Sequence, residues 1–329
     1  MLEGKKNMAD LLRKYWFLLG LAAVFAATLL DPTGGLAAFG RWLKLYNGPD
    51  AVIFLVFFFS GMLLDPQQIR TGVSDVSGTI AALVLIFVAA PLLAAVVALL
   101  PMGTGVATGL FLVAVMPTTL SSGVVMSGAA GGNPAHALFI TILANVLCMF
   151  TIPATLPLLL DMTGVNASEI VFDRLAVMIK IAFYVIVPLC LGLAVKYLAP
   201  GGFKTAGPKL QLVNQCLILC IVWMGVSQAL PVLSDDWSAM VQIAGLAALF
   251  HLALLGCAFL SVWMLSFPRG RMEQVIFMGS QKTLPLSIIL QVTLFPQYGQ
   301  ALMVCVLHHL VSLFMDGFLV GRLRRPEYK

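Results

Sequence analysis

The sequence contains little charge and no long polar stretch. Only 10% of its 329 residues are Asp, Glu, Lys or Arg, whereas an ordinary soluble domain has about 25%. Hydrophobic residues make up 60% of the chain, and the mean hydropathy is +1.01. A chain of this composition is expected to be an integral membrane protein. Its macromolecular surroundings are then the lipid bilayer, and we expect no nucleic-acid partner.

Sequence motifs of enzymes and pumps are also missing. The chain has no His-Glu-x-x-His, Gly-x-Ser-x-Gly or Ser-x-x-Lys arrangement and no Asp-rich pair that could face a prenyl diphosphate. It has no P-loop, which argues against a nucleotide-driven pump. The six cysteines lie within apolar runs, so we expect no disulfide framework. These absences predict a protein that is not an enzyme and has no cofactor, although Na+ or H+ remains a candidate coupling ion.

Long apolar segments are abundant. About 20 apolar residues suffice for a helix to cross a bilayer. Ten such segments, separated by short turns rich in Gly and Pro, lie at approximately 15–31, 47–64, 75–100, 104–130, 134–160, 170–198, 208–230, 238–266, 272–294 and 297–321. The predicted fold is therefore an all-α polytopic membrane protein, with residues 1–329 forming a single transmembrane unit.

Basic residues are distributed unevenly between alternate loops. With the N-terminus on the cytoplasmic side, 14 of the 19 Lys and Arg residues fall in inside segments, 3 in outside segments and 2 within spans. Cytoplasmic loops of membrane proteins carry such an excess of positive charge. The distribution predicts that both termini are cytoplasmic.

Two apolar segments are interrupted by polar sequences at matching places in the two halves. The fourth segment contains Pro117-Thr118-Thr119-Leu120-Ser121-Ser122-Gly123, and the ninth contains Gly279-Ser280-Gln281-Lys282-Thr283-Leu284-Pro285. Proline removes a backbone donor and clashes with the preceding turn, so both helices are predicted to break there. Because an odd number of spans reverses the second half, two sets of five would form an inverted repeat, about 15–160 and 170–321, with broken helices 4 and 9 crossing.

The two breaks are the candidate binding site. A broken helix leaves unpaired carbonyls at one end and unpaired amides at the other. Crossing would bring these ends together, where they could hold a small cation or an anion. The candidate residues are Pro117, Thr118, Thr119, Ser121, Ser122, Ser280, Gln281, Lys282, Thr283 and Pro285. The alternative for either break alone is a proline kink whose hydroxyls only satisfy freed backbone groups.

These motifs resemble the bile acid:sodium symporter superfamily. The strings Met116–Gly123 and Gly279–Leu286 are similar to its fourth- and ninth-span motifs, and Gly132-Asn133 followed by Thr141 resembles the start of its fifth span. The ninth-span string is most similar to the SBF-like branch, which includes bacterial sodium-dependent transporters and vertebrate member-seven carriers. The resemblance covers residues 10–325, approximately.

This resemblance implies a secondary transporter in the bacterial inner membrane that moves a small organic solute, anionic and in some cases amphipathic. It implies a core domain (about 75–160 plus 238–321) that rocks against a panel domain (about 15–64 plus 170–230). Asn133 and Thr141 join the candidate site by this resemblance, and Asn145 lies one helical turn after Thr141 on the same face. Asn145 would extend the polar site or bond to another helix.

The same motifs contain only part of the Na+ site that the resemblance implies. The resemblance implies Na+ ligands at Ser122, Thr141 and Gln281. Three other positions, where relatives carry Asn, Ser and a ligating Glu, hold Gly123, Ala137 and Phe277. The alternatives are a proton-coupled or uncoupled carrier that uses Lys282, and, in another class, a regulatory membrane protein that does not transport. Polar residues retained at both breaks argue against the last.

Lys282 brings a charge to a place where charge is costly and usually functional. Its ammonium could replace the absent sodium ion and hold the crossing together, could exchange a proton during transport, or could neutralise an anionic substrate. A fourth alternative is that the side chain extends to water from a helix end.

Ionisable residues in the eighth and tenth spans form a candidate proton relay with Lys282. They are His251, His309 and Asp316. The alternative is that Asp316 pairs with Arg322 near the cytoplasmic end, while the histidines are neutral packing residues. The sequence carries no signal for an oligomeric state.

Overall fold

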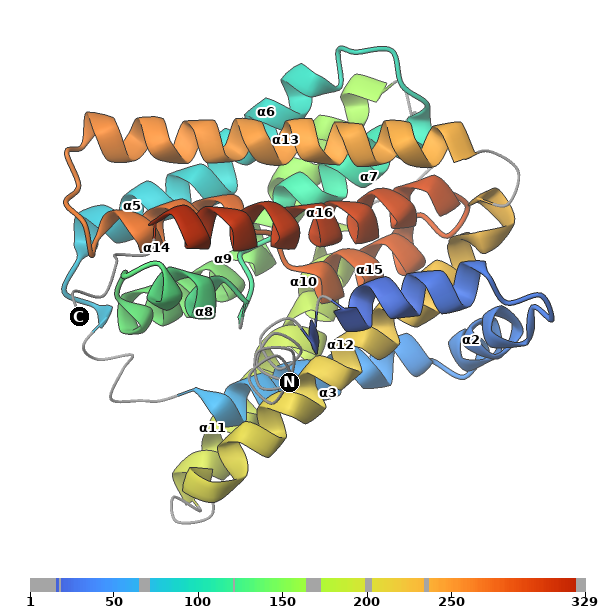
Figure 1. Cartoon of the computed structure of the whole chain (residues 1–329), viewed down its shortest axis with the longest axis horizontal. Coiled ribbons are helices and arrows are strands. Elements are labelled where there is room, and N and C mark those ends of the chain that lie inside the picture. The colour runs from blue at the N-terminus through green and yellow to red at the C-terminus, as the bar shows by residue number, and fades with distance from the viewer. Residues whose placement is uncertain are drawn as a thin grey trace, which may run out of the picture.

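The computed structural model describes residues 16–17, 19–64, 72–120, 122–163, 173–198, 203–233 and 237–323. All regular structure within these ranges is helical, so the predicted all-α class is confirmed for the described part of the chain. In Figure 1 the long helices α13 and α16 run side by side across the molecule, and α12 crosses obliquely below them.

The helices follow one another with few residues between them. They are α2 (Gly35–Leu45), α3 (Gly48–Leu63), α5 (Val76–Val84), α6 (Ala90–Val97), α7 (Thr104–Val115), α8 (Ser122–Ala129), α9 (Pro134–Leu160), α10 (Arg174–Ile181), α11 (Val187–Leu198), α12 (Phe203–Leu233), α13 (Trp237–Met264), α14 (Met272–Ser280), α15 (Leu284–Leu294) and α16 (Gly299–Leu323). A short apolar helix, Leu19–Leu29, precedes them. The π-helical turns η1 (Leu85–Ala89) and η3 (Ala182–Ile186) join α5 to α6 and α10 to α11, and the 3-10 turn η2 (Asp161–Thr163) follows α9.

The described helices include enough long apolar stretches for a multi-pass membrane protein. Seven are long and apolar enough to cross a bilayer, and an eighth forms if α2 and α3, which are bent by 80°, count as one span. The number ten stays a prediction. The first predicted span is described only from Trp16 onward, with Leu18 also outside the described residues, and the fourth predicted span is divided between α7 and α8.

One helix differs from the sequence-based expectation. The turn residues between the first two predicted spans indicate a connection, but the structure forms α2 there. The carboxylate of Asp31 accepts hydrogen bonds from the amides of Thr33 and Leu36 at 2.9 and 2.8 Å. It therefore satisfies amides that a starting helix leaves free. The same residues that indicate a turn also begin the helix.

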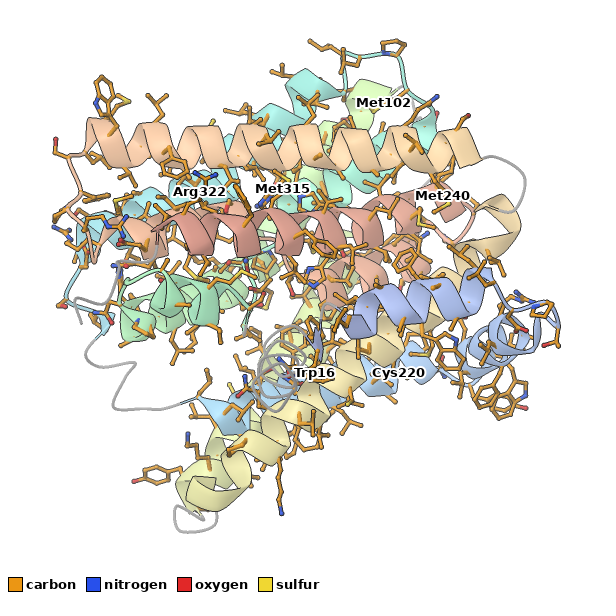
Figure 2. All side chains as sticks on the ribbon, in the orientation of Figure 1. Trp16, Met102, Cys220, Met240, Met315 and Arg322 are labelled. Carbon is orange, nitrogen blue, oxygen red and sulfur yellow. The ribbon has the colours of Figure 1, made fainter. Side chains whose placement is uncertain are left out.

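The surface of the long helices is apolar, as a bilayer requires. Figure 2 shows side chains projecting from every visible side of these helices. Large apolar side chains among them that are at least half exposed include Leu252, Leu260, Trp263, Phe314 and Phe318. In water such a surface would mark an interaction site, whereas lipid chains solvate it without cost.

Each π-helical turn lies two residues before a proline, at Pro91 and Pro188. A proline has no N–H and its ring clashes with the carbonyl four residues earlier, and a wider turn relieves that clash. In η1 the amide of Ala90 donates to the carbonyl of Leu85. In such a turn a carbonyl accepts from the amide five residues later. For Ile86 this residue is Pro91, which has no N–H. The Ile86 carbonyl is thereby left for a partner outside its own helix.

The helices form two groups by their contacts. In one, α3 packs on α2, α11 and α12. In the other, α14 and α16 pack on neighbours that include α5, α7, α8 and α13. The groups meet along α12–α16, α3–α15 and α9–α10. The division into panel and core domains and the inverted repeat stay predictions.

Within the first group, α3 and α11 approach closely at two glycines. A Cβ atom on Gly61 would lie 2.2 Å from the carbonyl oxygen of Leu189, and one on Gly192 would lie 2.0 Å from that of Phe58. Helices in a bilayer associate through such close backbone packing, because lipid gives no hydrophobic drive. Only glycine, which has no Cβ atom, fits at these two positions without moving the helices apart.

Replacing Gly192 with alanine should therefore lower the thermal unfolding midpoint of the detergent-purified protein. The added methyl group must push α11 away from α3, and overpacking of this kind costs about 1–3 kcal/mol. Gly256→Ala on α13 is the matched control, since nothing lies within 4 Å of its Cβ position. It should keep or raise the midpoint, because alanine favours helix over glycine. Equal midpoints for the two variants would contradict a tight α3–α11 contact.

Candidate functional site

The two predicted breaks lie against each other in the structure. The first runs from the end of α7 at Val115 to the start of α8 at Ser122, and the second separates Ser280 from Leu284. The backbone amide of Thr283 donates to the carbonyl of Pro117 at 2.9 Å. Residues from the two halves of the sequence thus meet through a direct backbone hydrogen bond.

Lys282 occupies the centre of this crossing. Its Nζ donates to the carbonyls of Ile86, Ala114 and Met116 at 2.9, 3.0 and 3.0 Å. These are the carbonyl freed by Pro91 in η1 and two carbonyls at the open end of α7. The side chain is 2% exposed. An ammonium has three donors and no acceptor, so its hydrogen-bonding capacity is filled by backbone oxygens.

Two further carbonyls of the first break are contacted by side chains of α9. Asn145 Nδ2 donates to the carbonyl of Thr118 at 3.4 Å, and Thr141 Oγ1 donates to that of Thr119 at 3.3 Å. The Thr119 hydroxyl in turn accepts the amide of Gly123 at 2.9 Å, near the start of α8. Open backbone at membrane depth persists only when it is partnered in this way.

A small pocket faces the crossing from the side of the first helix group. Its volume is about 30 Å³, which is room for roughly one water molecule. It is lined by Phe17, Val56, Phe57, Ser60, Thr119, Leu120, Ser122, Asn214, Ile218, Thr283, Pro285 and His309. Asn214 on α12 donates to Ser60 on α3 at 3.1 Å, across one wall. Polar residues of both breaks therefore lie together at this small pocket.

Gln281 connects this pocket to buried groups behind the crossing. Its Oε1 accepts the hydroxyls of Thr119 and Ser122 at 2.7 and 3.0 Å. Its Nε2 donates to Asp316 Oδ2 at 2.8 Å, and Asp316 Oδ1 lies 2.9 Å from His251 Nε2. Both Asp316 and His251 are 0% exposed. A continuous chain of hydrogen bonds therefore runs from the pocket to a buried His–Asp pair.

The alternative pairing of Asp316 with Arg322 is wrong. The carboxylate of Asp316 is buried between α13 and α14, whereas the Arg322 guanidinium lies over the ring of Phe318, 5.1 Å from its centre. Of the candidate relay residues, His309 lines the pocket and is separate from the His251–Asp316 pair.

The three suggested Na+ ligands are engaged with other groups of the protein. Ser122 and Gln281 hydrogen-bond directly to each other, whereas the Thr141 hydroxyl is used by the carbonyls of Ala137 and Thr119. Within the described ranges, no group of three or more His, Cys, Asp and Glu side chains could hold a metal ion.

Three other candidates lie apart from the pocket or outside the described ranges. The Ser280 hydroxyl donates to the carbonyl of Ile276 in its own helix at 2.8 Å. Asn133 is exposed at the start of α9, where its side chain accepts the amides of Ala135 and His136. Ser121 lies outside the described residues.

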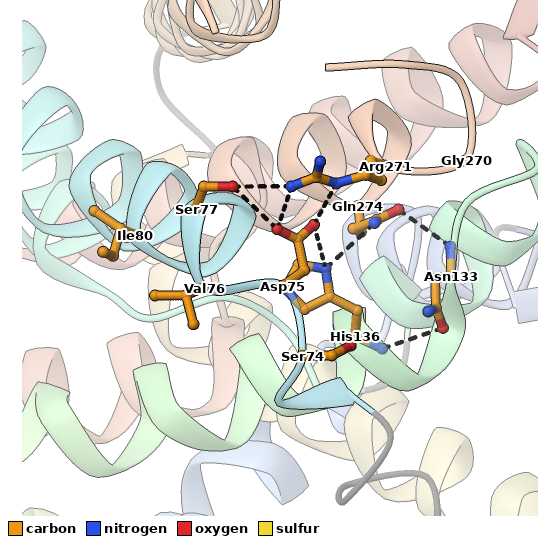
Figure 3. Close-up of a pocket in the computed structure, with 10 residues that line it drawn as sticks. All are labelled: Ser74, Asp75, Val76, Ser77, Ile80, Asn133, His136, Gly270, Arg271 and Gln274. Carbon is orange, nitrogen blue, oxygen red and sulfur yellow. Dashed lines mark hydrogen bonds and ion pairs between the residues drawn. The ribbon is translucent and has the colours of Figure 1, made fainter. Parts of the chain in front are cut away.

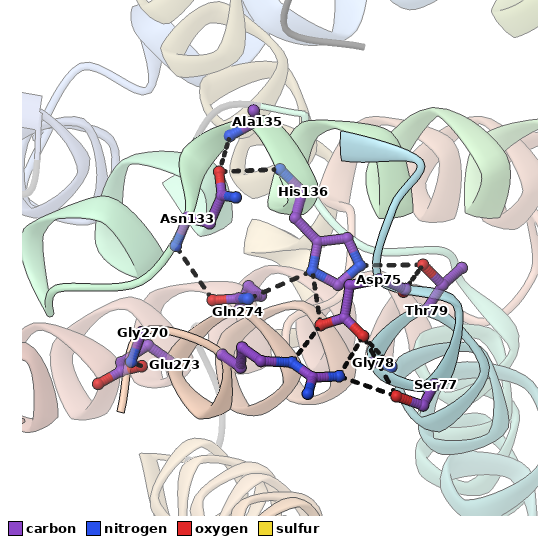
Figure 4. A network of polar contacts seen from close by, with 11 residues as sticks. Asp75, Ser77, Gly78, Thr79, Asn133, Ala135, His136, Gly270, Glu273 and Gln274 are labelled. Carbon is purple, nitrogen blue, oxygen red and sulfur yellow. Dashed lines mark hydrogen bonds and ion pairs between the residues drawn. The ribbon is translucent and has the colours of Figure 1, made fainter. Parts of the chain in front are cut away.

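A second polar cluster, which the sequence does not predict, joins the ends of α5, α9 and α14 (Figures 3 and 4). Arg271 donates to both carboxylate oxygens of Asp75, at 2.9 and 2.5 Å. His136 contacts Thr79 through Nε2 at 2.9 Å and Gln274 through Nδ1 at 3.2 Å. The cluster lines a pocket of about 700 Å³. In the sequence, an Asp before an apolar run indicates the start of a helix. The sequence does not indicate that this Asp pairs with an Arg 196 residues away.

The charges of this cluster stabilise each other. Burial of Asp75 opposes its ionisation, but the hydrogen bonds from Arg271 and the Gly78 amide outweigh burial and hold the pKa of Asp75 at about 2. The hydrogen bond to Asp75 likewise raises the pKa of Arg271. Since Asp75 also accepts the Gly78 amide at 2.9 Å, one carboxylate caps α5 and ties it to α14.

Acid should remove this stabilisation. Because the folded-state pKa of Asp75 lies below the ordinary 3.8, its contribution is present above that pH and is lost as the pH falls toward about 2. We expect Asp75→Asn to lower the thermal midpoint at pH 7 and to flatten its decline below about pH 4. Asp173→Asn is the control, because Asp173 caps α10 in the same way without an arginine across from it in the described structure. Equal losses in the two variants would show that Arg271 adds nothing to the cap.

Comparison with known proteins agrees with the family resemblance of the two break motifs. The model of the SBF-like CPA transporter family matches residues 15–325. The probable sodium/metabolite cotransporter BASS4, chloroplastic, of Arabidopsis thaliana is 28% identical over 288 residues, which is 83% of this chain and 65% of that protein. Sodium/bile acid cotransporter 7-A of Xenopus laevis is 25% identical over 329 residues, or 97% of this chain and 94% of that protein. The resemblance inferred from the two break motifs is confirmed: the chain belongs to the SBF-like CPA transporter family.

Proposed function

We propose that this protein is a secondary active transporter that moves a small organic anion across the bacterial inner membrane by alternating access, with both termini in the cytoplasm. The observation that carries the proposal is the small pocket of about 30 Å³ at the crossing. It lies between the two helix groups, and polar residues of both breaks line it. Relatives named as sodium/metabolite and sodium/bile acid cotransporters support the same function.

Alternating access requires the pocket to open by separation of the two helix groups. Its walls come from α3 and α12 on one side and from the breaks and α16 on the other. Few polar contacts join the two groups among the described residues. One is the bond of Lys180 Nζ to Thr293 Oγ1 at 2.5 Å, between α10 and α15. Breaking such a contact costs little, which suits a boundary that must open and close.

Lys282 acts in this proposal as a tethered replacement for a coupling cation. Three carbonyl oxygens at 2.9–3.0 Å surround its ammonium, and carbonyl oxygens are the ligands that a hard cation prefers. Phe277 stands where the family resemblance implies a ligating glutamate. The geometry favours this role over neutralising a substrate, because Lys282 is not among the residues that line the pocket.

Removing the lysine side chain should create a site for a free cation. Lys282→Ala leaves three buried carbonyls without donors, each costing about 1–3 kcal/mol, so its unfolding midpoint in choline chloride should fall well below that of the wild type. Sodium or potassium chloride at equal ionic strength should restore part of this loss in a concentration-dependent way.

Two controls make this result specific. Wild-type protein should respond equally to sodium and choline, because the ammonium already fills the place. Lys282→Met removes the charge but fills the space, so it should be destabilised without rescue. A Lys282→Ala protein that ignores the cation would contradict the replacement role.

Transport itself is tested by access to the pocket from both membrane faces. In a chain whose native cysteines are replaced, Ser60→Cys should react with an impermeant thiol reagent in right-side-out and in inside-out vesicles, because the pocket opens alternately to each side. Ala258→Cys is the control: this position is 0% exposed within a core cluster, so it should stay unlabelled. Labelling of Ser60→Cys from one face only would contradict alternating access and would favour a non-transporting membrane protein.

A further inference from the structure

The orientation of the Gln281 amide determines which groups at the pocket can donate a hydrogen bond. An ionised Asp316 only accepts, so the nitrogen of Gln281 faces it, with Nε2 2.8 Å from Oδ2. The amide oxygen must then face Thr119 and Ser122. The Thr119 hydroxyl donates to it at 2.7 Å, and the Ser122 hydroxyl donates either to it at 3.0 Å or to the Thr119 oxygen at 2.9 Å. Both hydroxyls line the pocket. Both protons are thereby directed at groups of the protein itself, and neither is available to a molecule in the pocket.

A proton on Asp316 would reverse this arrangement. A protonated carboxyl group has one O–H donor. Its other oxygen continues to pair with His251 at 2.9 Å. The best partner for the new O–H is the oxygen of Gln281, which reaches it when the amide turns by half a rotation. The amide nitrogen then donates to the oxygens of Thr119 and Ser122, and their hydroxyl protons are released toward the pocket. Two such donors suit an oxygen of a carboxylate, sulfonate or sulfate group.

We propose that Asp316 is the proton-binding site of this protein and that Gln281 is a positioning residue, which converts protonation of Asp316 into two hydroxyl donors for an anion at the crossing. The inference rests on the proposed transport function and names its coupling ion. Each anion would enter with a proton taken from the same aqueous phase. Anion and proton then strengthen each other's binding by the same factor, as linkage requires.

The charge of the buried centre supports a ratio of one proton to each singly charged anion. Among the described residues, the crossing holds one buried basic side chain, Lys282, and one buried acidic side chain, Asp316, at 2% and 0% exposure. These charges balance while the histidines are neutral. An anion bound beside Thr119 and Ser122 would leave one negative charge unbalanced in a low-dielectric site, which is costly. A proton on Asp316 restores the balance without moving Lys282.

The other ionisable groups near Asp316 are less suitable for this role. On α13, His251 already faces the carboxylate through Nε2, and its Nδ1 has no hydrogen-bond partner in the described structure. A proton added there would meet no acceptor and would not turn the Gln281 amide. On α16, the ring of His308 lies 5.7 Å from that of His251, and His309 faces the pocket.

The elements packed around the pair add little further charge. Lys282, which follows α14, is held by three carbonyls, and Glu273 on α14 pairs with Arg269 at 2.9 Å. The sequences of η1, α6, α7, α8 and α15 contain no ionisable side chain. The remaining titratable groups on α13 and α16 are the thiols of Cys257 and Cys305 and, at the far end of α16, Arg322. Among the described residues, Asp316 is thus the acidic group in contact with a residue that also contacts the pocket hydroxyls.

Infrared difference spectroscopy of the purified wild-type protein between pH 9 and pH 5 tests the proton site without a substrate. We expect a carbonyl stretching band of a buried carboxylic acid to appear on acidification and to be absent from Asp316→Asn. Glu273→Gln is the matched control, since it removes another buried carboxylate of the same region (0% exposed) and should keep the band. If the wild type and Asp316→Asn give the same difference spectrum between pH 9 and pH 5, the proposal is overturned.

The coupling to the pocket is tested by two further variants in the same experiment. In Gln281→Leu the band should persist and move to higher wavenumber, because the acid loses the acceptor of its O–H. In Thr119→Val/Ser122→Ala the hydroxyls that hold the amide in its present orientation are gone, so the band at an intermediate pH should be larger than in the wild type. An Asp316 band that neither variant alters would overturn the amide switch.

These outcomes remain separate from the test of transport. An Asp316 band together with labelling of Ser60→Cys from only one face would keep the proton site and reject alternating access. Labelling from both faces without an Asp316 band would do the reverse.

Discussion

The three hydrogen bonds of the Lys282 ammonium are the contact on which the rest of the crossing depends. They take up carbonyls from two different helices, one at a π-helical turn and two at a broken end. Each of these carbonyls would otherwise be exposed to a medium that offers no donor, where an unsatisfied polar group costs several kcal/mol. A single charged side chain thereby allows two irregular backbone segments to lie together at membrane depth.

The same requirement explains the surroundings of the crossing. Pro91 frees the Ile86 carbonyl, and the first break frees a run of carbonyls after α7. Asn145 and Thr141 then supply donors from α9, and the Thr283 amide supplies another from the second break. Polar side chains that the sequence suggested as ligands of an ion or a substrate are therefore used largely by the protein's own backbone. Among the polar groups that line the pocket, the hydroxyls of Thr119 and Ser122 hydrogen-bond to Gln281.

The contacts of Lys282 and those of Gln281 thus have different roles in the site. Lys282 has all three donors occupied and holds the crossing in place. The Gln281–Asp316–His251 chain is the part that we propose to vary, through a turn of the Gln281 amide and a proton on Asp316. A transporter needs both: a rigid crossing to preserve the site through the cycle, and a group whose state depends on the ion that drives transport.

Features that depend on local chemistry could be predicted from the residues alone. Hydropathy indicated a membrane protein of the all-helical class, proline and polar residues located both breaks, and the motifs at those breaks indicated the family. Partners distant along the chain could not be predicted: Lys282 with Ile86, Gln281 with Asp316, and Asp75 with Arg271. These contacts depend on how helices pack, and apolar helices of similar composition offer many packings. The packed structure was needed to show that the lysine faces backbone oxygens and that the acid of α16 lies behind the glutamine, because both outcomes require donors and acceptors to meet at hydrogen-bond distance.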